Sequence, residues 1–271
     1  MQASPQPQSL NLACRTALSF IRSSPLSRGK SRRIILNFIK KHITHPIITD
    51  FRGVPFILNL DNTTEQKALF GKYNLQELAF LKAGTSRVGA TFVDLGANCG
   101  FYTQNFLAGE GQNRQVLAIE PNPSMCKRIT ANVTLLKQEQ PENDTKLILE
   151  CCAIGNSDGE AELDLTDGVG GATIVGEKNT NTITVKIEKL TNILKKHGID
   201  KIDVLKVDIE GYEDVALVPF FTQADPHLFP KHIIIEHTGS ENWKEDLFAV
   251  LKDKGYTIMG KTRGNLLLTK Q

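Results

Sequence analysis

The sequence lacks a long apolar run, and no stretch in its 271 residues approaches the about 18 to 20 apolar residues of a membrane-spanning helix. Near the N-terminus, the apolar segment LNLACRTALSFI is interrupted by Arg15 and has no basic segment ahead of it, so we do not expect a secretory signal. Cysteine is scarce, and its five positions contain no C-x-x-C pair of the kind that binds zinc. We therefore expect a cytoplasmic protein with reduced thiols at Cys14, Cys99, Cys126, Cys151 and Cys152.

Acidic residues are missing ahead of Asp50, where eight basic residues stand, so the rest of the chain carries a charge of −6 within the overall +2. Ile34, Ile35 and Phe38 follow helical spacing in this segment. The favoured interpretation is a basic, partly helical extension over residues 1–48 that packs on a main domain of residues 49–271. Weak contact with an anionic membrane surface and an organelle transit peptide are the alternatives. Nucleic-acid binding is not expected, because no helix-turn-helix or RNA-recognition motif accompanies the charge.

Strand-like and helix-like patterns alternate from residue 91 onward, which predicts an α/β fold with a parallel sheet and helices on both faces. Helices are expected to begin near Phe101 and at Pro123. Two short strands within residues 48–60 and a helix over about 64–82 precede this region. The expected sheet strands are residues 91–96, 115–120, 146–154, 203–209 and 232–237, followed by an antiparallel pair at 256–261 and 264–270.

Residues 155–188 interrupt this alternation with a segment rich in Gly, Asn, Asp and Thr. Within it, Ala161, Leu163 and Leu165 alternate with acidic residues, and a second alternation runs through Val185. The pattern predicts inserted, half-exposed β structure, with a mobile loop at DGVGGAT between the two runs. A substrate lid and a surface decoration are equally compatible with it.

The segment FVDLGANCGFYT places Asp94, Gly96, Asn98 and Gly100 where a strand turns into a helix. Glycines at this place let the backbone approach a ligand, but the G-x-G-x-x-G pattern of dinucleotide binding is absent. A carboxylate in the strand disfavours a pyrophosphate and suits a positively charged ligand. The amino and sulfonium groups of S-adenosylmethionine (SAM) meet that requirement. Glu120, which ends the second strand, can accept hydrogen bonds from ribose hydroxyls, and this would serve NAD and SAM equally.

Charged residues also occupy the end of the fourth strand, in IDVLKVDIEGYE. Lys206, Asp208 and Glu210 share one face by period two, and burial of unpaired charges costs several kcal/mol, so they need partners or a ligand. For Lys206, a structural ion pair with Asp208 or Glu210 is an equal alternative. The neighbouring fifth strand ends at Glu236 and His237, so we expect these carboxylates to converge with the fourth strand. A lone strand-end histidine is more often structural than catalytic.

The motifs FVDLGANCGFYT, AIEPNP, LKVDIEGYE and IIIEH, with GKYNLQEL ahead of them, resemble the FkbM family of SAM-dependent methyltransferases over about residues 50–260. The resemblance implies a class I methyltransferase (Rossmann-like) fold with a seven-stranded sheet of order 3-2-1-4-5-7-6. It implies SAM as cofactor and O-methylation of a hydroxyl in a sugar, glycolipid, polyketide or similar small-molecule acceptor. By position it assigns the methionine end of SAM to Asp94, Gly96, Asn98 and Gly100, the ribose to Glu120, and the methyl donor to Asp208. For the adenine, the segment AIGNSD offers the backbone of Ala153 and Ile154, with the acidic residue Asp158 farther along.

A hydroxyl acceptor needs a general base, which we expect among Asp208, Glu210, Glu236 and His237, with Asp208 and Glu236 first. A Mg²⁺ ion held by Asp208 and Glu236 is an alternative that nothing in the sequence requires. Two other functions stay open at this point. One is a nicotinamide-dependent oxidoreductase on a similar sheet, and the other is a non-catalytic binding module that retains the fold.

Overall fold

The computed structural model describes residues 7–24, 29–43, 46–165, 173–175 and 181–271. A seven-stranded sheet forms the centre of the molecule, and six of its strands run parallel while β14 is antiparallel to both of its neighbours. The spatial order corresponds to 3-2-1-4-5-7-6 along the chain, so the expected fold class and strand order are confirmed. From one edge to the other, the strands are β13 (Tyr256–Lys261), β14 (Asn265–Lys270), β12 (His232–Glu236), β11 (Val204–Val207), β4 (Thr91–Leu95), β5 (Gln115–Ile119) and β6 (Lys146–Glu150).

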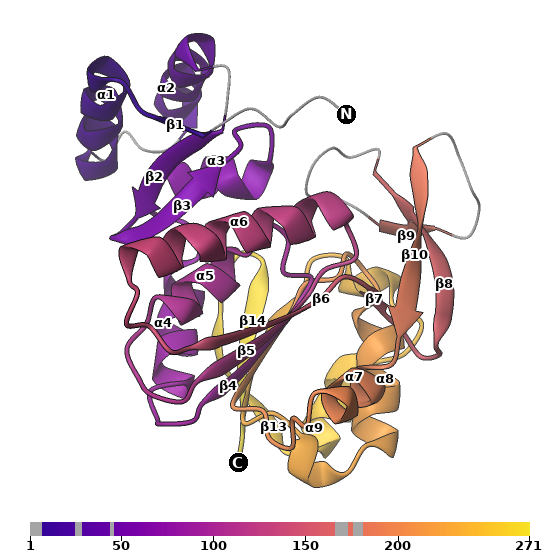
Figure 1. Ribbon diagram of the computed structural model, residues 1–271. Coiled ribbons are helices and arrows are strands. Elements are labelled where there is room, and N and C mark those ends of the chain that lie inside the picture. Colours follow the sequence, from indigo (N-terminus) through magenta and orange to yellow (C-terminus); the bar gives the residue numbers. More distant parts are fainter. Residues whose placement is uncertain (1–6, 25–28, 44–45, 166–172, 176–180) are drawn as a thin grey trace.

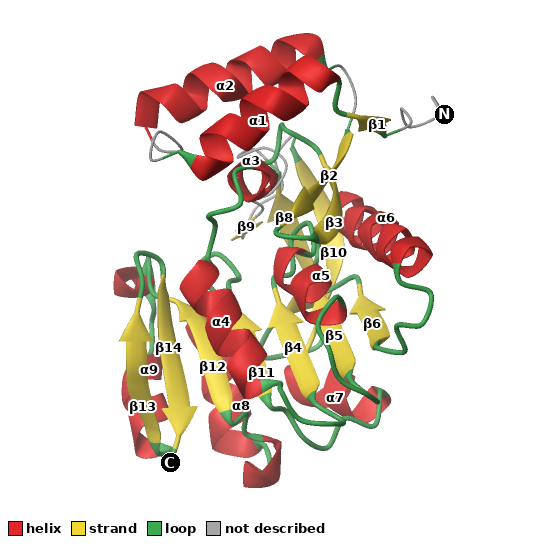
Figure 2. Ribbon diagram, turned by 90° about the vertical axis from the view of Figure 1, so that its left-hand side faces the viewer, coloured by secondary structure: helices red, strands yellow, loops and turns green. Residues whose placement is uncertain are grey.

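Helices cover both faces of this sheet (Figures 1 and 2). Successive residues of a strand point to opposite faces. Val204 accordingly packs in one apolar cluster with the helices α4 (Leu75–Gly84), α5 (Phe101–Leu107) and α6 (Pro123–Glu139). Leu205 packs in a second cluster with α7 (Leu190–Lys196), α8 (Glu213–Gln223) and α9 (Leu247–Asp253). Two short 3-10 helices, η1 (Pro226–Leu228) and η2 (Ser240–Asn242), lie in the connections around β12.

Three boundaries differ from the sequence-based expectation. The helix expected over residues 64–82 is two helices, α3 (Thr63–Leu69) and α4, because Gly71 and Asn74 adopt positive φ between them. The strand expected over residues 146–154 ends at Glu150, and β7 (Ala153–Ile154) belongs to a different sheet. The fourth strand ends at Val207, so Asp208 already lies in the loop that follows it.

The inserted segment forms the expected β structure. β8 (Gly159–Asp164) pairs antiparallel with β9 (Thr173–Val175) and with β10 (Thr182–Glu188), which also pairs with β7. Leu163 and Val185, one from each predicted alternation, are buried in a small apolar cluster of this sheet. The loop expected in DGVGGAT falls on residues 166–172, outside the described residues.

Ahead of the central sheet, the chain forms β1 (Gln8–Ser9), the helices α1 (Leu12–Ser23) and α2 (Gly29–His42), and a hairpin of β2 (Ile47–Phe51) and β3 (Val54–Leu58). The inner sides of both helices pack on the main domain, because Leu18 and Ile39 belong to the same apolar cluster as Phe101 of α5. Within the described ranges, no helix combines the length and the apolarity that crossing a bilayer requires.

Candidate active site

A pocket opens where strands β4, β5, β11 and β12 end at their carboxyl ends, which is the usual ligand site of an open α/β sheet. Loops after these strands, together with α3 and the inserted sheet, supply its walls. The residues that line it include Thr63, Thr64, Lys67, Tyr73, Gly96, Asn98, Tyr102, Glu120, Met125, Cys152, Ala153, Ile154, Leu163, Ile174, Lys206, Asp208, Glu210, Tyr212 and Glu236.

The turn after β4 forms one wall of the pocket and requires glycine. Gly96 has φ +71°, and a Cβ at this position would lie 1.8 Å from the backbone oxygen of Asp208. Gly100 also has positive φ, and its Cβ would lie 3.0 Å from Ile129 of α6. Asn98 stands between them, and its side-chain oxygen accepts hydrogen bonds from Asn62 at 2.9 Å and from the Cys99 N–H at 2.7 Å. Only glycine therefore lets the β4 turn pass so close to the β11 turn.

Glu120 follows β5 and faces the same pocket. Its two carboxylate oxygens accept hydrogen bonds from the backbone N–H groups of Asn98 at 2.7 Å and of Asn122 at 2.9 Å. Burial raises the pKa of the Glu120 carboxyl to about 7, against the lowering effect of these bonds. Each carboxylate oxygen keeps a free lone pair, so this group can accept two further hydrogen bonds from a diol.

Asp94 lies beneath this pocket, fully buried in β4. Among the described residues it does not line the pocket wall; its carboxylate accepts a hydrogen bond from Thr103 at 2.7 Å and lies 3.6 Å from the Lys206 ammonium. Lys206 lies equally far from Asp208, at 3.6 Å, and donates a 2.7 Å hydrogen bond to the Gly96 oxygen. Burial lowers the pKa of Lys206, but the two carboxylates outweigh burial and raise it. The structural pairing open from the sequence is therefore present, with Asp94 as a partner in addition to Asp208.

Carboxylates of the fourth and fifth strands do converge at the pocket. Asp208, Glu210 and Glu236 all line it. Burial and the neighbouring Asp208 charge raise the pKa of Glu236 to about 8, although the Thr238 hydroxyl donates a hydrogen bond to it. His237 lies outside the set of pocket-lining residues in the described part of the chain, with its ring 3.4 Å from the Thr262 carbonyl oxygen.

Cys152, Ala153 and Ile154 line the opposite side of the pocket, together with Met125 and Leu163. Asp158 lies outside this set, and its carboxylate is occupied by hydrogen bonds from the Lys189 N–H and the Asn192 side chain. The pocket wall here is thus apolar side chains and backbone.

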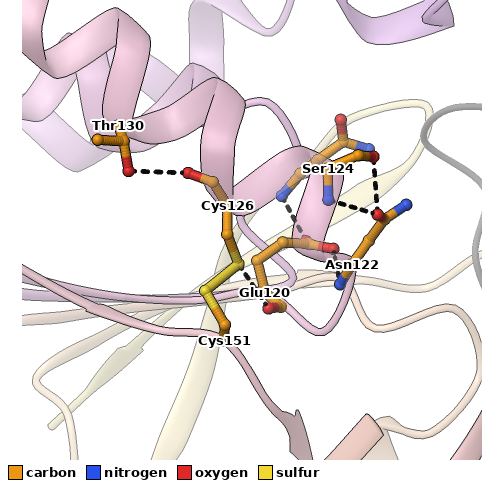
Figure 3. The surroundings of a disulfide bond; sticks show 7 residues. Glu120, Asn122, Ser124, Cys126, Thr130 and Cys151 are labelled. Atoms are coloured by element: carbon orange, nitrogen blue, oxygen red, sulfur yellow. Dashed lines mark hydrogen bonds between the residues drawn. A yellow bond between two sulfur atoms is a disulfide. The ribbon is translucent and has the colours of Figure 1, made fainter. Parts of the chain in front are cut away.

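A disulfide joins Cys126 of α6 to Cys151 (Figure 3), which follows β6 and directly precedes Cys152 of this wall. It corrects the expectation that all five cysteines are reduced. The Cα atoms of Cys126 and Cys151 lie 6.2 Å apart, within the range that a disulfide spans. The Sγ atom of Cys126 lies 3.2 Å from the backbone carbonyl oxygen of Glu120. Sequence spacing could not reveal the pair, because the proximity depends on how α6 packs beside β6. Cys14, Cys99 and Cys152 are free thiols.

Sequence reasoning missed the pocket residues ahead of β4, notably Thr63, Lys67 and Tyr73. Burial raises the pKa of Tyr73 to about 12, and the Lys67 ammonium lies 5.2 Å from its ring centre. The GKYNLQEL motif contained Tyr73, so the resemblance marked this segment, but periodicity gave it only a helical role. Tyr102, in the FVDLGANCGFYT segment, was likewise not singled out.

A possible metal-ligand cluster lies beside the pocket at Glu150, Cys152 and Glu188, whose ligand atoms fall within 4.8 Å of one another. Its carboxylates already have cationic partners. Glu150 accepts from Lys196 at 2.6 Å and also contacts His197, and Glu188 pairs with Lys186. This cluster is explained as a set of ion pairs.

Residues 94–258 of the chain match the family described as the methyltransferase FkbM domain. The chain belongs to this family. The methyltransferase sdnD of Sordaria araneosa is 23% identical over 199 residues, which cover 61% of this chain and 73% of that protein. Among solved structures, the FkbM methyltransferase from Methylobacillus flagellatus KT is similar with a TM-score of 0.47 and 16% identity, over 95% of this chain and 58% of that one. The chain therefore spans little more than half the length of that protein.

A further solved structure with a TM-score of 0.47 is the O-methyltransferase from Bacillus cereus in complex with SAH, which is 10% identical over 95% of this chain and 100% of that one. Family membership decides between the functions that the sequence left open. As a member of this family, the chain is a SAM-dependent methyltransferase. The alternatives of a nicotinamide-dependent oxidoreductase and of a non-catalytic binding module are therefore not pursued. The turn at Gly96 and the two acceptor oxygens of Glu120 fit SAM as cofactor.

Proposed function

We propose that the protein transfers the methyl group of SAM to a hydroxyl oxygen of a small-molecule or carbohydrate acceptor, such as a sugar, a glycolipid or a polyketide. This proposal rests on one observation: two carboxylates and the expected cofactor-binding residues lie in the same pocket. The carboxylates of Asp208 and Glu236 line the same pocket as the Gly96 turn and Glu120. A proton acceptor and a cofactor cradle are thus contiguous, as O-methylation of a weakly nucleophilic alcohol requires.

The cofactor would lie along the ends of β4 and β5. Glu120 would accept the two ribose hydroxyls with its free lone pairs, and the β4 turn at Gly96 and Asn98 would contact the methionine end. The adenine would pack between Met125 and the Cys152–Ile154 wall. SAM supplies an activated methyl group on a sulfonium. Asp208 faces the pocket from the adjoining turn, so its carboxylate would attract that positive charge.

Asp94 and Gly100 would act without touching the cofactor. Asp94 fixes the Lys206 ammonium, which in turn binds the Gly96 oxygen and the Asp208 carboxylate. Gly100 lets α5 begin against α6 and so sets the direction of the β4 turn. We propose both as positioning residues, in place of the direct contacts that the resemblance implied for them.

Glu236 is the proposed general base. Its raised pKa makes it a stronger proton acceptor than an ordinary carboxylate, and its place at the pocket gives it access to a bound acceptor. Glu236 would take the hydroxyl proton of the acceptor as its oxygen gains the methyl group, and the sulfur would leave as the neutral thioether of SAH. Most of the rate enhancement would come from alignment of oxygen, carbon and sulfur, which can contribute about 7 to 11 kcal/mol.

The test is transfer of labelled methyl from SAM to a panel of sugars, glycolipids and polyketide alcohols, with amines and thiols as competing acceptors. We expect product carrying an O-methyl group, identified by NMR. Glu236→Gln should lower kcat by about 10² or more, since a general base contributes roughly 10² to 10⁴. Glu241→Gln, an exposed glutamate in η2, is the matched control and should leave kcat unchanged. Methyl groups found on nitrogen, sulfur or carbon would refute the proposed O-methylation.

A further inference from the structure

The outward side of the α1–α2 pair carries large apolar side chains in solvent. Leu12 is 80% exposed, Phe20 and Ile34 are each 66% exposed, and Phe38 is 38% exposed. Leu12 and Phe20 are eight residues apart on α1, and Ile34 and Phe38 are four apart on α2, so each pair lies on one helix face. Both helices bury their opposite sides in the same apolar cluster, so both exposed sides are turned away from that cluster. We call the surface of these four residues the outer face.

Helices α1 and α2 also carry basic side chains, and only some of these form an ion pair with a carboxylate. Arg22 and Lys40 each have a carboxylate at 3.2 Å, from Asp50 and Asp61 respectively. By contrast, a second set of four has no carboxylate within ion-pair distance among the described residues: Arg15, Lys30, Arg33 and Lys41.

Helical spacing puts part of this charge directly beside the apolar residues. Lys30, Ile34, Phe38 and Lys41 follow one another at intervals of four, four and three residues along one face of α2. Helix α2 itself contains no acidic residue to offset these positive charges, since no Asp or Glu precedes Asp50 in the sequence. The outer face therefore has an apolar ridge, and on α2 a lysine stands at each end of it.

The α1–α2 pair is also fixed to the domain. Arg22 donates a 2.9 Å hydrogen bond to the Leu69 oxygen at the end of α3, and the Arg32 guanidinium lies 5.1 Å from the Phe70 ring centre. The other end of α3 supplies Thr63 and Thr64 to the pocket wall. In Figure 2 the arrowheads of β4, β5 and β6 point toward the end of the molecule that carries α1 and α2. The outer face and the pocket thus lie toward the same end.

From this combination we propose that the outer face docks the protein on an anionic lipid bilayer. The apolar ridge would enter the boundary between headgroups and acyl chains, and the four unneutralised bases would contact the headgroups. A second copy of the chain fits this face poorly, because a two-fold interface would bring Lys30 and Lys41 against like charges. An ordinary solvated helix does not require the exposed apolar side chains of Ile34 and Phe38 in one row with those lysines.

The experiment is co-sedimentation of the full chain with vesicles of phosphatidylcholine alone and of phosphatidylcholine with 30% phosphatidylglycerol. We expect at least tenfold stronger partitioning onto the anionic vesicles. Phe20→Ser with Ile34→Ser should reduce it at least tenfold. Lys30→Glu with Lys41→Glu should do the same, since each basic group near an anionic surface contributes about fivefold.

Matched controls stand elsewhere on the surface. Ile258 and Met259 of β13 are 61% and 66% exposed, so changing both to Ser removes equal apolar exposure from another site. Lys137→Glu with Lys252→Glu repeats the charge reversal on exposed lysines of α6 and α9. Both controls should stay within twofold of wild type, and SAM affinity should be unchanged in every variant.

Three results would overturn the proposal. They are equal or absent binding to the two kinds of vesicle, control variants that lose as much binding as the outer-face variants, and a dimer in solution that Phe20→Ser with Ile34→Ser converts to monomer. The last would assign the outer face to a second copy of the chain. None of these measurements depends on methyl transfer, so the docking and the proposed reaction fail or succeed separately.

Discussion

Asp208 and Glu236 lie side by side at the ends of neighbouring parallel strands. β11 and β12 pair in a register that sets Val207 against Ile235, and Asp208 and Glu236 are the residues that directly follow these two. The negative charge of Asp208 adds to burial and raises the pKa of Glu236 to about 8. The Lys206 ammonium contacts Asp208 from below at 3.6 Å. The two acids thus have different surroundings, because in the described part of the chain only Asp208 of the two has the buried Lys206 ammonium within ion-pair distance.

The raised pKa of Glu236 predicts the pH dependence of methyl transfer. A base must be deprotonated to accept the hydroxyl proton, so kcat should rise with pH through a limb near pH 8, the raised pKa of Glu236. Asp208→Asn removes the neighbouring charge, and the limb should move to lower pH even if the maximal rate falls. Glu241→Gln, in exposed η2, should leave the limb in place. The measurement is a pH–rate profile at saturating SAM. If the midpoint of the rising limb stays at the same pH in Asp208→Asn, the assignment of Glu236 as the base is contradicted.

A second prediction concerns the ribose. Glu120→Gln keeps the size of the side chain but replaces one acceptor oxygen with an NH₂ group that cannot accept from a hydroxyl. The same change places a donor against the N–H of Asn98 or Asn122. We expect SAM to bind at least tenfold more weakly by calorimetry, with a parallel loss for SAH. Glu142→Gln, exposed in the loop after α6, serves as the control, and unchanged affinity in Glu120→Gln would exclude the ribose contact.

Most of the architecture was predictable because it depends on local periodicity. Alternating apolar runs and short turn signals located the seven strands, and the family resemblance gave their order, which the structure confirms. The inserted β pairing also followed from residues 161–165 and 183–187. The errors lie where backbone conformation overrides pattern. Positive φ at Gly71 and Asn74 divides one helix into two, and apolar composition alone gives no sign of this break.

That Asp208 and Glu236 meet at one pocket was predictable from residue type and strand order, whereas the depth of a side chain below the pocket was not. Asp94, the residue before the last in β4, is fully buried and faces Lys206, a pairing that the spacing of the charged residues did not indicate. His237 immediately follows Glu236, but successive residues at a strand end diverge, and its ring turns to Thr262. Pocket residues from α3 were missed because no spacing rule links them to β4, which begins only at Thr91.

The Cys126–Cys151 disulfide gives a third prediction. It closes a segment with a sequence separation of 25, and such a link stabilises the folded state by about 3 kcal/mol through loop entropy. A reductant should therefore lower Tm by several degrees in the wild type and have no effect in Cys126→Ser with Cys151→Ser. Alkylation of the unfolded, unreduced chain should label the three thiols that the structure leaves free. If all five cysteines are labelled and the reductant leaves Tm unchanged, Cys126 and Cys151 do not form a disulfide.

Lys206 provides the last prediction, on stability. Lys206→Met leaves the buried carboxylate of Asp94 without a cation, and breaking a buried pair in this way costs about 3 to 5 kcal/mol. Burial already raises the pKa of Asp94, so the loss should be smallest below its ordinary pKa and should grow as pH rises and the carboxylate ionises. Adding Asp94→Asn should recover part of the lost stability at pH 8, whereas Lys252→Met on the surface should change little. Urea unfolding of the single and double variants measures the coupling, and strictly additive effects would mean that the two residues do not stabilise each other.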